Sequence, residues 1–418
     1  MSKLALRLGL SFVLLVYGGV NLYVGHHLYR ALAPLIPPLR PWWFAMAYGA
    51  LAALLLLTFF PLPRKAHRRG SWFGSYWMGL FAYLMFWFVV ADALFVGALL
   101  LGVVPWPAPA DLLDRGWLAA AAAAAITAAY GILNALRIRN VRYEIGLDRL
   151  QPAGLAGPAA DQAAASAEDP AAPPTGSASL HIVVISDLHL GAVHSERRFA
   201  RVVDKILALQ PDLILIPGDL FNDDINRIQH PERVQRLFRR LAEHAPCGVY
   251  ASLGNHDGGR TFPRMVEFVR GSGVTLLMEE TAVADSPLGR IALVGRLDPS
   301  PIGGYGDLRR KPTKELFAEV EELAPGLPVI VLDHTPPRLA KYAGKADLVV
   351  SGHTHKGQVF PNSVLTRFLY EVDYGHARKE PDGPHIVVTS GAGLWGMPLR
   401  VGSSNEIVEI VLRTRAAG

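Results

Sequence analysis

The segment Asp347–Phe360, DLVVSGHTHKGQVF, joins a run of apolar, β-branched residues to a glycine and then to two histidines. The apolar run predicts a buried strand, and Gly352 predicts a tight turn at its end. His353 and His355 follow, one on either side of Thr354. Because residues two apart at a strand end can face the same side, the pair predicts a binding site beyond this strand.

Four other apolar runs end in the same way. Their polar endings are Asp187 and His189 in VVISDLHLG, Asp219 in LILIPGDLFND, Asn255, His256 and Asp257 in VYASLGNHDG, and His334 in VIVLDHTPP. In open α/β sheets, ligands bind beyond the carboxyl ends of the strands. We therefore expect all five strand ends to converge on one site.

The pattern around these motifs predicts an α/β fold. From His181 onward, short apolar strands alternate with segments of helical spacing, such as residues 196–209 and 232–244. Towards the C-terminus strands follow one another with little helix between them. We expect a second, more antiparallel sheet there.

The polar residues at the strand ends are imidazoles, carboxylates and an amide, without a thiolate. This set suits borderline-hard metal ions and disfavours a structural zinc site. A lone Asp or His at a strand end is usually a cap or a turn residue, but five such ends in order are hard to attribute to chance. They offer too many ligands for one tetrahedral ion. Two ions sharing a carboxylate, roughly 3.5–4 Å apart, account for them better.

The ordered motifs SDLHLG, GDLFND, GNHD, DHTP and GHTHKGQ resemble the calcineurin-like metallophosphoesterase superfamily over about Leu180–Leu412. The closing segment GAGLWGMPLRVGSSNEIVEIVLR is similar to the bacterial membrane-associated branch, in which the domain follows several N-terminal helices. The resemblance implies a two-sheet α-β-β-α sandwich with two divalent metal ions, Mn, Fe or Zn.

The resemblance also implies a role for each motif residue. The first ion would be held by Asp187, His189 and His355, the second by Asn255, His334 and His353, with Asp219 bridging the two. His256 would be the acid that protonates the leaving oxygen, and Asp257 would either orient His256 or serve the turn. Arg296 and Asp298 would contact the substrate or be structural.

The expected reaction is hydrolysis of a phosphodiester or pyrophosphate bond. Serine/threonine protein phosphatases of the superfamily carry an arginine after the GD motif and a glutamate after GNH, whereas this chain has GDLFNDDIN and Asp257. Pyrophosphatases that cleave UDP-diacylglucosamine often carry an arginine where this chain has His256. Neither assignment therefore matches the motifs fully.

The chain has 418 residues, of which 51% are hydrophobic, and this share indicates membrane segments. Four apolar stretches precede residue 140, at about 8–24, 42–60, 72–104 and 117–136. Each is near or above the roughly 20 residues that cross a bilayer. We expect an all-α transmembrane domain of about four helices at residues 1–140, and take the first stretch as a retained helix rather than a signal peptide.

Basic residues predict the orientation of these helices. Nine of them lie before the first stretch, between the second and third, and after the fourth; three lie in the other two loops. The positive-inside rule then places the N-terminus and everything after the fourth helix in the cytoplasm. The expected location is the inner (plasma) membrane, in a multi-pass arrangement. Much of the net charge of +5 lies near the apolar stretches, which indicates membrane topology rather than nucleic-acid binding.

Residues 148–179 are rich in Ala, Pro, Gly and Ser and predict a flexible linker before a metallophosphoesterase domain at 180–413. The expected partners are the lipid bilayer and a phosphoester substrate, which tethering suggests is a lipid or a lipid-linked compound. Two alternatives stay open: a non-catalytic metal-binding scaffold, and a transporter or sensor with a hydrolase output domain. Only Asp92, an acid within the third stretch, favours the latter; we expect a neighbouring helix to cap it, or an interfacial position.

Overall fold

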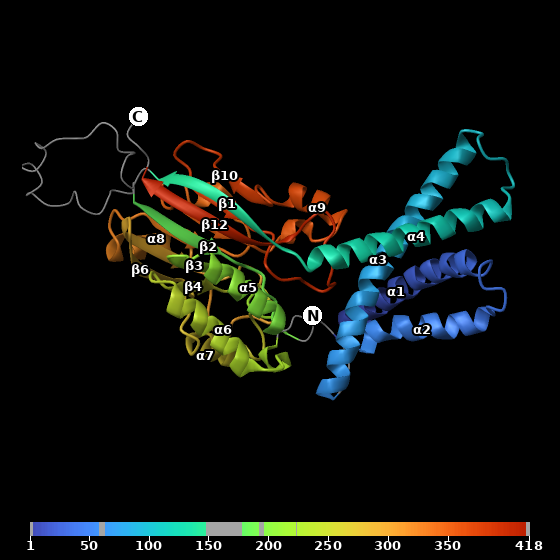
Figure 1. Ribbon diagram of the computed structural model, residues 1–418, viewed down its shortest axis with the longest axis horizontal. Helices are drawn as coiled ribbons and strands as arrows, with labels where there is room; N and C mark the ends of the chain where they lie inside the picture. Colours follow the sequence, from blue (N-terminus) through green and yellow to red (C-terminus); the bar gives the residue numbers. More distant parts are fainter. Residues whose placement is uncertain (1–2, 58–62, 148–177, 192–195, 223, 415–418) are drawn as a thin grey trace, which may run out of the picture. The chain divides into compact units, whose positions relative to one another are not determined.

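The computed structural model describes residues 3–57, 63–147, 178–191, 196–222 and 224–414 (Figure 1). The chain divides into two compact units. The helical unit combines residues 1–134 with residues 396–401, and the sandwich unit combines residues 135–395 with residues 402–418. The predicted linker falls almost wholly on residues 148–177, which lie outside the described residues.

The described part of the helical unit has four α-helices. They are α1 (Lys3–Leu32), α2 (Pro41–Leu57), α3 (Arg64–Leu100) and α4 (Ala110–Ala135). Two of them are long and apolar enough to cross a membrane: α3 from Lys65 on, with a mean hydropathy of 2.1, and α4, with 1.6. The described residues thus show two candidate membrane helices, not the four that we expect from the sequence.

Asp92, on α3, is surrounded by side chains of α1 and α4. Tyr23 Oη donates to Asp92 Oδ2 at 2.6 Å, and Trp117 Nε1 donates to Asp92 Oδ1 at 2.9 Å. His27 Nε2 lies 3.0 Å from Asp92 Oδ2, and His27 Nδ1 lies 2.9 Å from the Tyr23 carbonyl oxygen. Neighbouring helices therefore cap Asp92, as expected.

The short segment 396–401 packs within the helical unit. Arg400 N donates to the Gly131 carbonyl at 2.9 Å, and Asn134 Nδ2 donates to the Arg400 carbonyl at 3.0 Å. Leu399 is fully buried beside Gly79 and Gly131, and a Cβ at Gly79 would overlap its side chain. The absence of a side chain at Gly79 is thus what admits Leu399.

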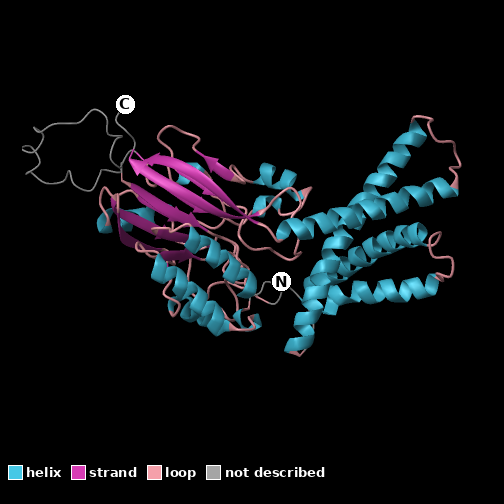
Figure 2. Ribbon diagram, viewed as in Figure 1, coloured by secondary structure: helices cyan, strands magenta, loops and turns pink. Residues whose placement is uncertain are grey.

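The sandwich unit holds two six-stranded sheets (Figures 1 and 2). The first runs in the order β1 (Ile138–Leu147), β12 (Asn405–Thr414), β2 (Ser179–Val184), β3 (Leu213–Pro217), β4 (Val249–Ser252) and β5 (Thr275–Leu276). The second runs in the order β10 (Gly375–Ala377), β11 (His385–Val388), β9 (Leu348–Ser351), β8 (Val329–Leu332), β7 (Gly289–Gly295) and β6 (Glu280–Ser286). The strands in the middle of the second sheet pair in parallel, and those at its two edges pair antiparallel. In the first sheet, β12 and β2 pair antiparallel.

Alternating side chains of the strands form three apolar layers. Ile182 and Val184 of β2 pack in the core between the sheets with Ile330 and Leu332 of β8. The residue between the first two, Val183, packs on the opposite face. This period of two is what a strand buried on both faces requires. The layers are therefore α-β-β-α, as the family resemblance implies.

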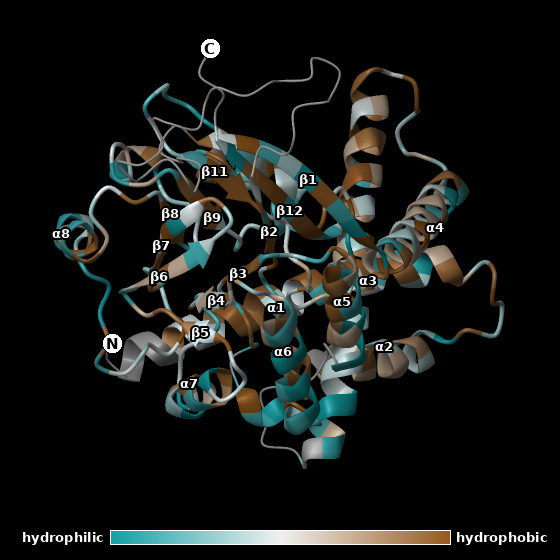
Figure 3. Ribbon diagram, turned by 60° about the vertical axis from the view of Figure 1, so that its left-hand side comes forward, coloured by the Kyte–Doolittle hydropathy of each residue, from teal (hydrophilic) through white to brown (hydrophobic). Residues whose placement is uncertain are grey.

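Helices cover the outer faces of both sheets. The first sheet is covered by α5 (Glu196–Ala208), α6 (Pro231–His244) and α7 (Phe262–Arg270), and the second by α8 (Thr313–Leu323). Apolar and polar residues lie on opposite sides of α6 (Figure 3). The remaining helix, α9 (Asn362–Leu369), buries none of its residues. Three 3₁₀ turns complete the unit: η2 (Ile225–Arg227), η3 (Leu339–Lys341) and η4 (His355–Gly357).

Candidate metal centre

The structure brings every site residue expected from the sequence to one place, beyond the carboxyl ends of five strands. Asp187 and His189 follow β2, Asp219 follows β3, Asn255 and His256 follow β4, His334 follows β8, and His353 and His355 follow β9. Parallel strands end at the same edge of a sheet, and here two sheets contribute. Their loops therefore meet in one cluster.

Three side chains form the first group of candidate ligands. His355 Nε2 lies 3.4 Å from Asp187 Oδ1 and 3.1 Å from His189 Nε2. These atoms all lie within 4.8 Å of one another, and the three residues are buried. Together they offer two imidazole nitrogens and a carboxylate oxygen, a donor set that could hold a divalent cation.

A second group forms around Asn255. Its Oδ1 lies 2.9 Å from His353 Nδ1 and 3.2 Å from His334 Nε2. His353 and His355 thus face different groups, so the turn of η4 separates two imidazoles that are two residues apart in the sequence.

Asp219 lies between the two groups. Its Oδ2 is 3.5 Å from His189 Nε2 in the first group and 3.2 Å from His334 Nε2 in the second. Its Oδ1 accepts a hydrogen bond of 2.9 Å from the backbone N–H of His256. One carboxylate oxygen therefore contacts both groups, which is the position that a bridging ligand requires.

The arrangement of lone pairs suits cations. His334 Nδ1 lies 2.9 Å from the carbonyl of Pro217, so Nδ1 carries the hydrogen in the neutral ring and Nε2 presents its lone pair. That lone pair faces two oxygens, Asp219 Oδ2 and Asn255 Oδ1. Acceptors that face acceptors need a positive charge between them, which either a proton on His334 Nε2 or a metal cation supplies. Nitrogen and oxygen donors without sulfur suit Mn, Fe or Zn.

Burial and mutual charge shift the pKa values of the cluster. Burial raises the pKa of Asp187 to about 6, although His334 opposes the shift. Burial also disfavours ionisation of Asp219, but the charge and hydrogen bond of His334 outweigh it and hold the pKa of that carboxyl below its usual range. In the reverse sense, Asp219 outweighs burial and raises the pKa of His334. Burial and the charge of His334 lower the pKa of His353 to about 4. A bound divalent cation would favour the ionised carboxyls further.

Five of these side chains stand on left-handed backbone. The φ angles are 54° at Asp187, 45° at His189, 51° at Asp219, 68° at His353 and 49° at His355. Such a conformation at a residue other than glycine costs about 1–3 kcal/mol and clusters at functional sites. The glycine of the GHTH motif serves close packing instead, because a Cβ at Gly352 would overlap Ser186 Oγ and Asp187 Oδ2.

His256 lies beside the first group of candidate ligands. It is half-buried, and its ring centroid lies 5.1 Å from that of His189 and 6.1 Å from that of Trp395. Of the two roles considered for Asp257, the structure shows the turn role. Asp257 Oδ2 accepts from the backbone N–H of Gly254 at 2.9 Å, and its Oδ1 accepts from that of Phe221 at 3.0 Å.

Two residues considered as substrate contacts are structural. Arg296 is buried and donates from Nε to Glu279 Oε1 at 3.2 Å. Asp298 accepts from Thr335 Oγ1 at 2.6 Å and from the backbone N–H of Ser300 at 2.8 Å. Both side chains therefore hold the loop that follows β7.

Sequence reasoning missed three supports of the centre. Ser186 Oγ donates to Asp187 Oδ2 at 2.6 Å. The two terminal nitrogens of Arg310, Nη1 and Nη2, donate to Asp333 at 2.9 and 2.7 Å, and Asp333 directly precedes His334. The adjacency of Ser186 and Asp333 to motif residues was the available signal. The partner of Asp333 lies 23 residues away in a loop, and no pattern marks it.

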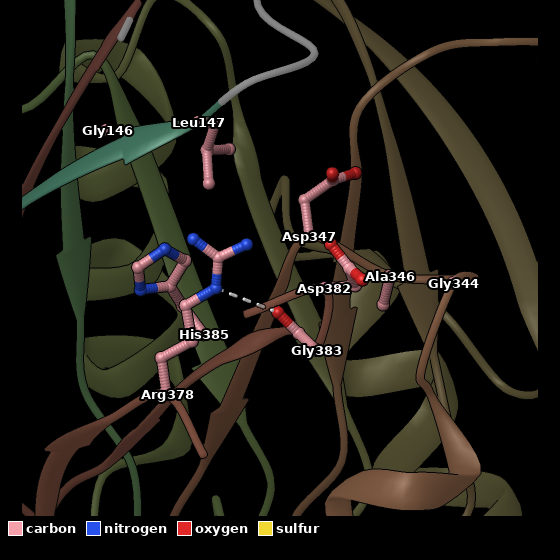
Figure 4. Close-up of a pocket in the computed structure, with 9 residues that line it drawn as sticks. All are labelled: Gly146, Leu147, Gly344, Ala346, Asp347, Arg378, Asp382, Gly383 and His385. Atoms are coloured by element: carbon pink, nitrogen blue, oxygen red, sulfur yellow. Dashed lines mark hydrogen bonds between the residues drawn. The ribbon is translucent and has the colours of Figure 1, made fainter. Parts of the chain in front are cut away.

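A second hollow lies at the other end of the second sheet (Figure 4). It has a volume of about 240 Å³, and its walls include Asp347, Arg378, Asp382 and His385. Arg378 Nε donates to the Gly383 carbonyl at 3.1 Å. Asp347 precedes β9, whereas His353 follows it, so this hollow and the metal centre lie at opposite ends of that strand. We assign it no ligand.

Comparisons with known proteins match the part of the chain that carries these residues. Residues 180–357 match the family model of the calcineurin-like phosphoesterases. An uncharacterized metallophosphoesterase of Aquifex aeolicus is 31% identical over 237 residues, which are 56% of this chain and 85% of that protein. An uncharacterized metallophosphoesterase of Helicobacter pylori is 28% identical over 56% of this chain and 60% of its own length.

A third relative carries a membrane description. A transmembrane protein with metallophosphoesterase domain from Danio rerio is 30% identical, over 56% of this chain and 53% of its own length. The matched region thus spans little more than half of the Danio rerio and Helicobacter pylori relatives. The match to the Aquifex aeolicus protein and to the family model shows that the chain belongs to the calcineurin-like metallophosphoesterase family and carries its metal-dependent phosphohydrolase domain.

Proposed function

We propose that this protein is a membrane-anchored phosphoesterase that uses two divalent metal ions to hydrolyse a phosphodiester or pyrophosphate bond. The observation that carries the proposal is the position of Asp219 Oδ2 between His189 Nε2, at 3.5 Å, and His334 Nε2, at 3.2 Å. One carboxylate oxygen shared by two groups of nitrogen and oxygen donors is the arrangement of two-metal hydrolases.

Each residue keeps the role that the sequence suggests. Asp187, His189 and His355 would hold the first ion; Asn255, His334 and His353 would hold the second; Asp219 would bridge them. Bound there, the ions would supply Lewis acidity and lower the pKa of a water. His256, half-buried beside the cluster, would give its proton to the departing alkoxide, which general acid catalysis requires. The hydrogen bond from its backbone N–H to Asp219 Oδ1 fixes the position of that residue.

The proposal includes the membrane and the domain order. The helical domain of residues 1–140, with α3 and α4 as its candidate spans, would lie in the inner membrane in a multi-pass arrangement, and the metallophosphoesterase domain of residues 180–413 would lie in the cytoplasm. Its support is the two candidate spans in α3 and α4, the relative described as a transmembrane protein, and the nine basic residues on one side. A membrane tether raises the local concentration of the enzyme at the bilayer, which favours a lipid or lipid-linked substrate.

The test is hydrolysis by the purified full chain. Bis-p-nitrophenyl phosphate and p-nitrophenyl phosphate are supplied with Mn²⁺, Fe²⁺, Zn²⁺ or Mg²⁺ in turn. We expect metal-dependent cleavage of the diester that Asp219→Ala abolishes. The matched control is Asp204→Ala, which removes an exposed carboxylate of α5 that pairs with Arg240. Two metal ions bound per chain without turnover of either compound would favour the scaffold alternative instead.

A further inference from the structure

Helix α9 exposes its apolar side and turns its polar side towards the domain. Its apolar side chains Val364, Leu365, Phe368 and Leu369 are all exposed, and Phe368 keeps 84% of its surface. The polar residues Ser363 and Thr366, on the opposite side, are half-buried. A helix on a soluble domain presents the reverse pattern, with the apolar side inward. Large contiguous apolar patches at a surface mark interaction sites.

The polar side of α9 is tied to the metal-ligand loop. Thr366 Oγ1 donates to Asp373 Oδ2 at 2.9 Å, and Thr354 Oγ1 donates to the Asp373 carbonyl at 2.7 Å. Thr354 stands between His353 and His355. A Cβ at Gly357, in η4, would overlap the backbone of Asn362 and Ser363. Thus α9 is held against the loop that carries two candidate ligands, and its apolar side faces outward.

A second exposed apolar side chain extends this surface to the centre. Trp395 is 51% exposed, and its ring centroid lies 6.1 Å from that of His256. Gln358, between η4 and α9, bonds both the N–H of Trp395 at 2.8 Å and its carbonyl at 2.7 Å. We call α9 together with Phe360 and Trp395 the apolar rim. It borders the candidate catalytic residue on one side and the His353 loop on the other.

Charges around the rim are mainly basic. Arg367 is exposed on α9 itself, and Arg338 and Lys341 are exposed at η3. Glu371 accepts from the backbone N–H of Leu339 at 3.1 Å, so η3 and its basic side chains lie next to the end of α9. The acids beside α9 are Glu371 and Asp373, which accept from the Leu339 N–H and from Thr366 Oγ1. Exposed Lys and Arg beside an apolar helix side suit an anionic lipid surface.

The covalent structure also limits the distance to a bilayer. Two residues, 136 and 137, separate α4 from β1, and α4 is one of the two candidate membrane helices. Three Cα–Cα steps lead from Ala135 to Ile138, and they span at most about 11 Å. The first strand of the sandwich therefore begins close to where that helix ends.

We propose that the apolar rim docks into the lipid surface of the membrane and delivers lipid phosphoesters to the metal centre. This inference deepens the proposed function and rests on it, because delivery matters only if the centre hydrolyses a phosphoester. The aromatic and aliphatic side chains of α9 enter the headgroup boundary, while Arg367, Arg338 and Lys341 contact anionic headgroups. Trp395 lies along the path from the bilayer to His256.

Docking is tested without catalysis. The full chain is reconstituted into vesicles of phosphatidylcholine and phosphatidylglycerol, with or without brominated acyl chains. In a Cys247→Ser background, a fluorophore is attached through Leu365→Cys on α9 or, as the matched control, through Glu322→Cys, an exposed position on α8. We expect bromine to quench the first label and not the second, because interfacial helices sit about 5–10 Å deep.

Equal quenching of the two labels, or none at either, overturns the docking proposal. A third result would also overturn it. If oxidation links two chains through a disulfide at unlabelled Leu365→Cys, and bromine does not quench the label on the same variant, then a second copy of the chain covers the rim instead of lipid.

Delivery is tested with two diesters that share a leaving group. One is a diacylglycerol p-nitrophenyl phosphate in vesicles, and the other is soluble bis-p-nitrophenyl phosphate. We expect Phe368→Ser to lower the ratio of vesicle to soluble turnover about tenfold, as loss of an aromatic contact with lipid predicts. Leu323→Ser, which changes an exposed leucine of α8, should leave the ratio unchanged. An unchanged ratio in Phe368→Ser overturns delivery.

The two proposals fail separately. If the wild-type chain hydrolyses neither diester while the label on Leu365→Cys is quenched, the phosphoesterase proposal fails and docking stands. If it hydrolyses the soluble diester while the label is not quenched, the phosphoesterase proposal stands and docking fails.

Discussion

Asp219 in the sandwich unit and Asp92 in the helical unit are both carboxylates in contact with a histidine Nε2, but their surroundings differ. Asp92 receives a hydroxyl from Tyr23 and an indole N–H from Trp117, in addition to His27. Asp219 Oδ2 has two imidazole nitrogens, and beyond them lie the oxygens of Asp187 and Asn255.

The contrast teaches how to distinguish a structural carboxylate from a metal ligand. Tyr23 Oη and Trp117 Nε1 each donate to one oxygen of Asp92, so both oxygens have a donor from the protein alone. Asp219 Oδ2 instead faces two imidazole nitrogens, His189 Nε2 and His334 Nε2. An imidazole nitrogen can bind a metal ion, whereas an indole N–H can only donate. The type of the partner atoms therefore separates two sites that share the pairing of Asp with His.

The largest effect is expected from the two histidines of the GHTH motif. His353→Gln and His355→Gln should each lower diester turnover on the order of 10³-fold, because the centre acts as a unit. Each should also lose about one metal ion per chain, since the two rings face different groups. Metal content and turnover are measured together. His230→Gln, an exposed histidine before α6, is the control, and two ions retained in both variants would contradict the assignment.

A smaller loss of turnover is expected from Asp257→Asn. The Asp257 carboxylate lies beside the metal centre but accepts hydrogen bonds from backbone N–H groups. It ties the loop after β3 to the loop after β4 through backbone N–H groups. Asp257→Asn should weaken metal affinity by about 10–100-fold, the usual cost of losing a group that positions ligands. Turnover is titrated with metal after depletion. Excess metal should restore it, and a loss that saturating metal leaves in place would instead assign Asp257 to the chemistry at His256.

The smallest effect on turnover is expected from Asp92→Asn. Soluble diester turnover should change by less than about twofold, because the contacts described for Asp92 are made with Tyr23, His27 and Trp117 of the helical unit and share no partner with the metal centre. The free energy of unfolding should fall by about 1–3 kcal/mol, since a donor is left unpaired. Tryptophan fluorescence during heating in detergent reports the unfolding. Asp111→Asn, an exposed acid on α4, is the control. Lost turnover in a folded Asp92→Asn variant would revive the sensor alternative.

The sequence alone predicts the strands and the place of the site because both depend on local signals. Buried strands such as LILIP and LVVS are continuous apolar runs, and the polar residue after each run marks its carboxyl end. The convergence of five ends follows from the general rule for α/β sheets. Asp187, Asp219, Asn255 and the histidines are therefore accessible to sequence reasoning.

Features that depend on distant partners are not accessible in this way. The pairing of β1 with β12 joins residues more than 260 positions apart, and nothing in the pattern of Val141–Leu147 names its neighbour. The left-handed backbone at His189 or His353 has no sequence signature, because it is imposed by the surrounding packing. The exposed apolar side of α9 is recognisable only once the structure shows which side the domain covers.

Strand β12 is bonded to β1 on one side and to β2 on the other, and residues 148–177 lie between those two strands in the chain. The ladder between β1 and β12 runs over ten residue pairs, from Ile138 with Asn405 to Leu147 with Thr414. A protease that cut once within residues 148–177 would give two polypeptides still joined by that ladder. The helices and the metal ligands could accordingly be supplied as two separate fragments that complement each other.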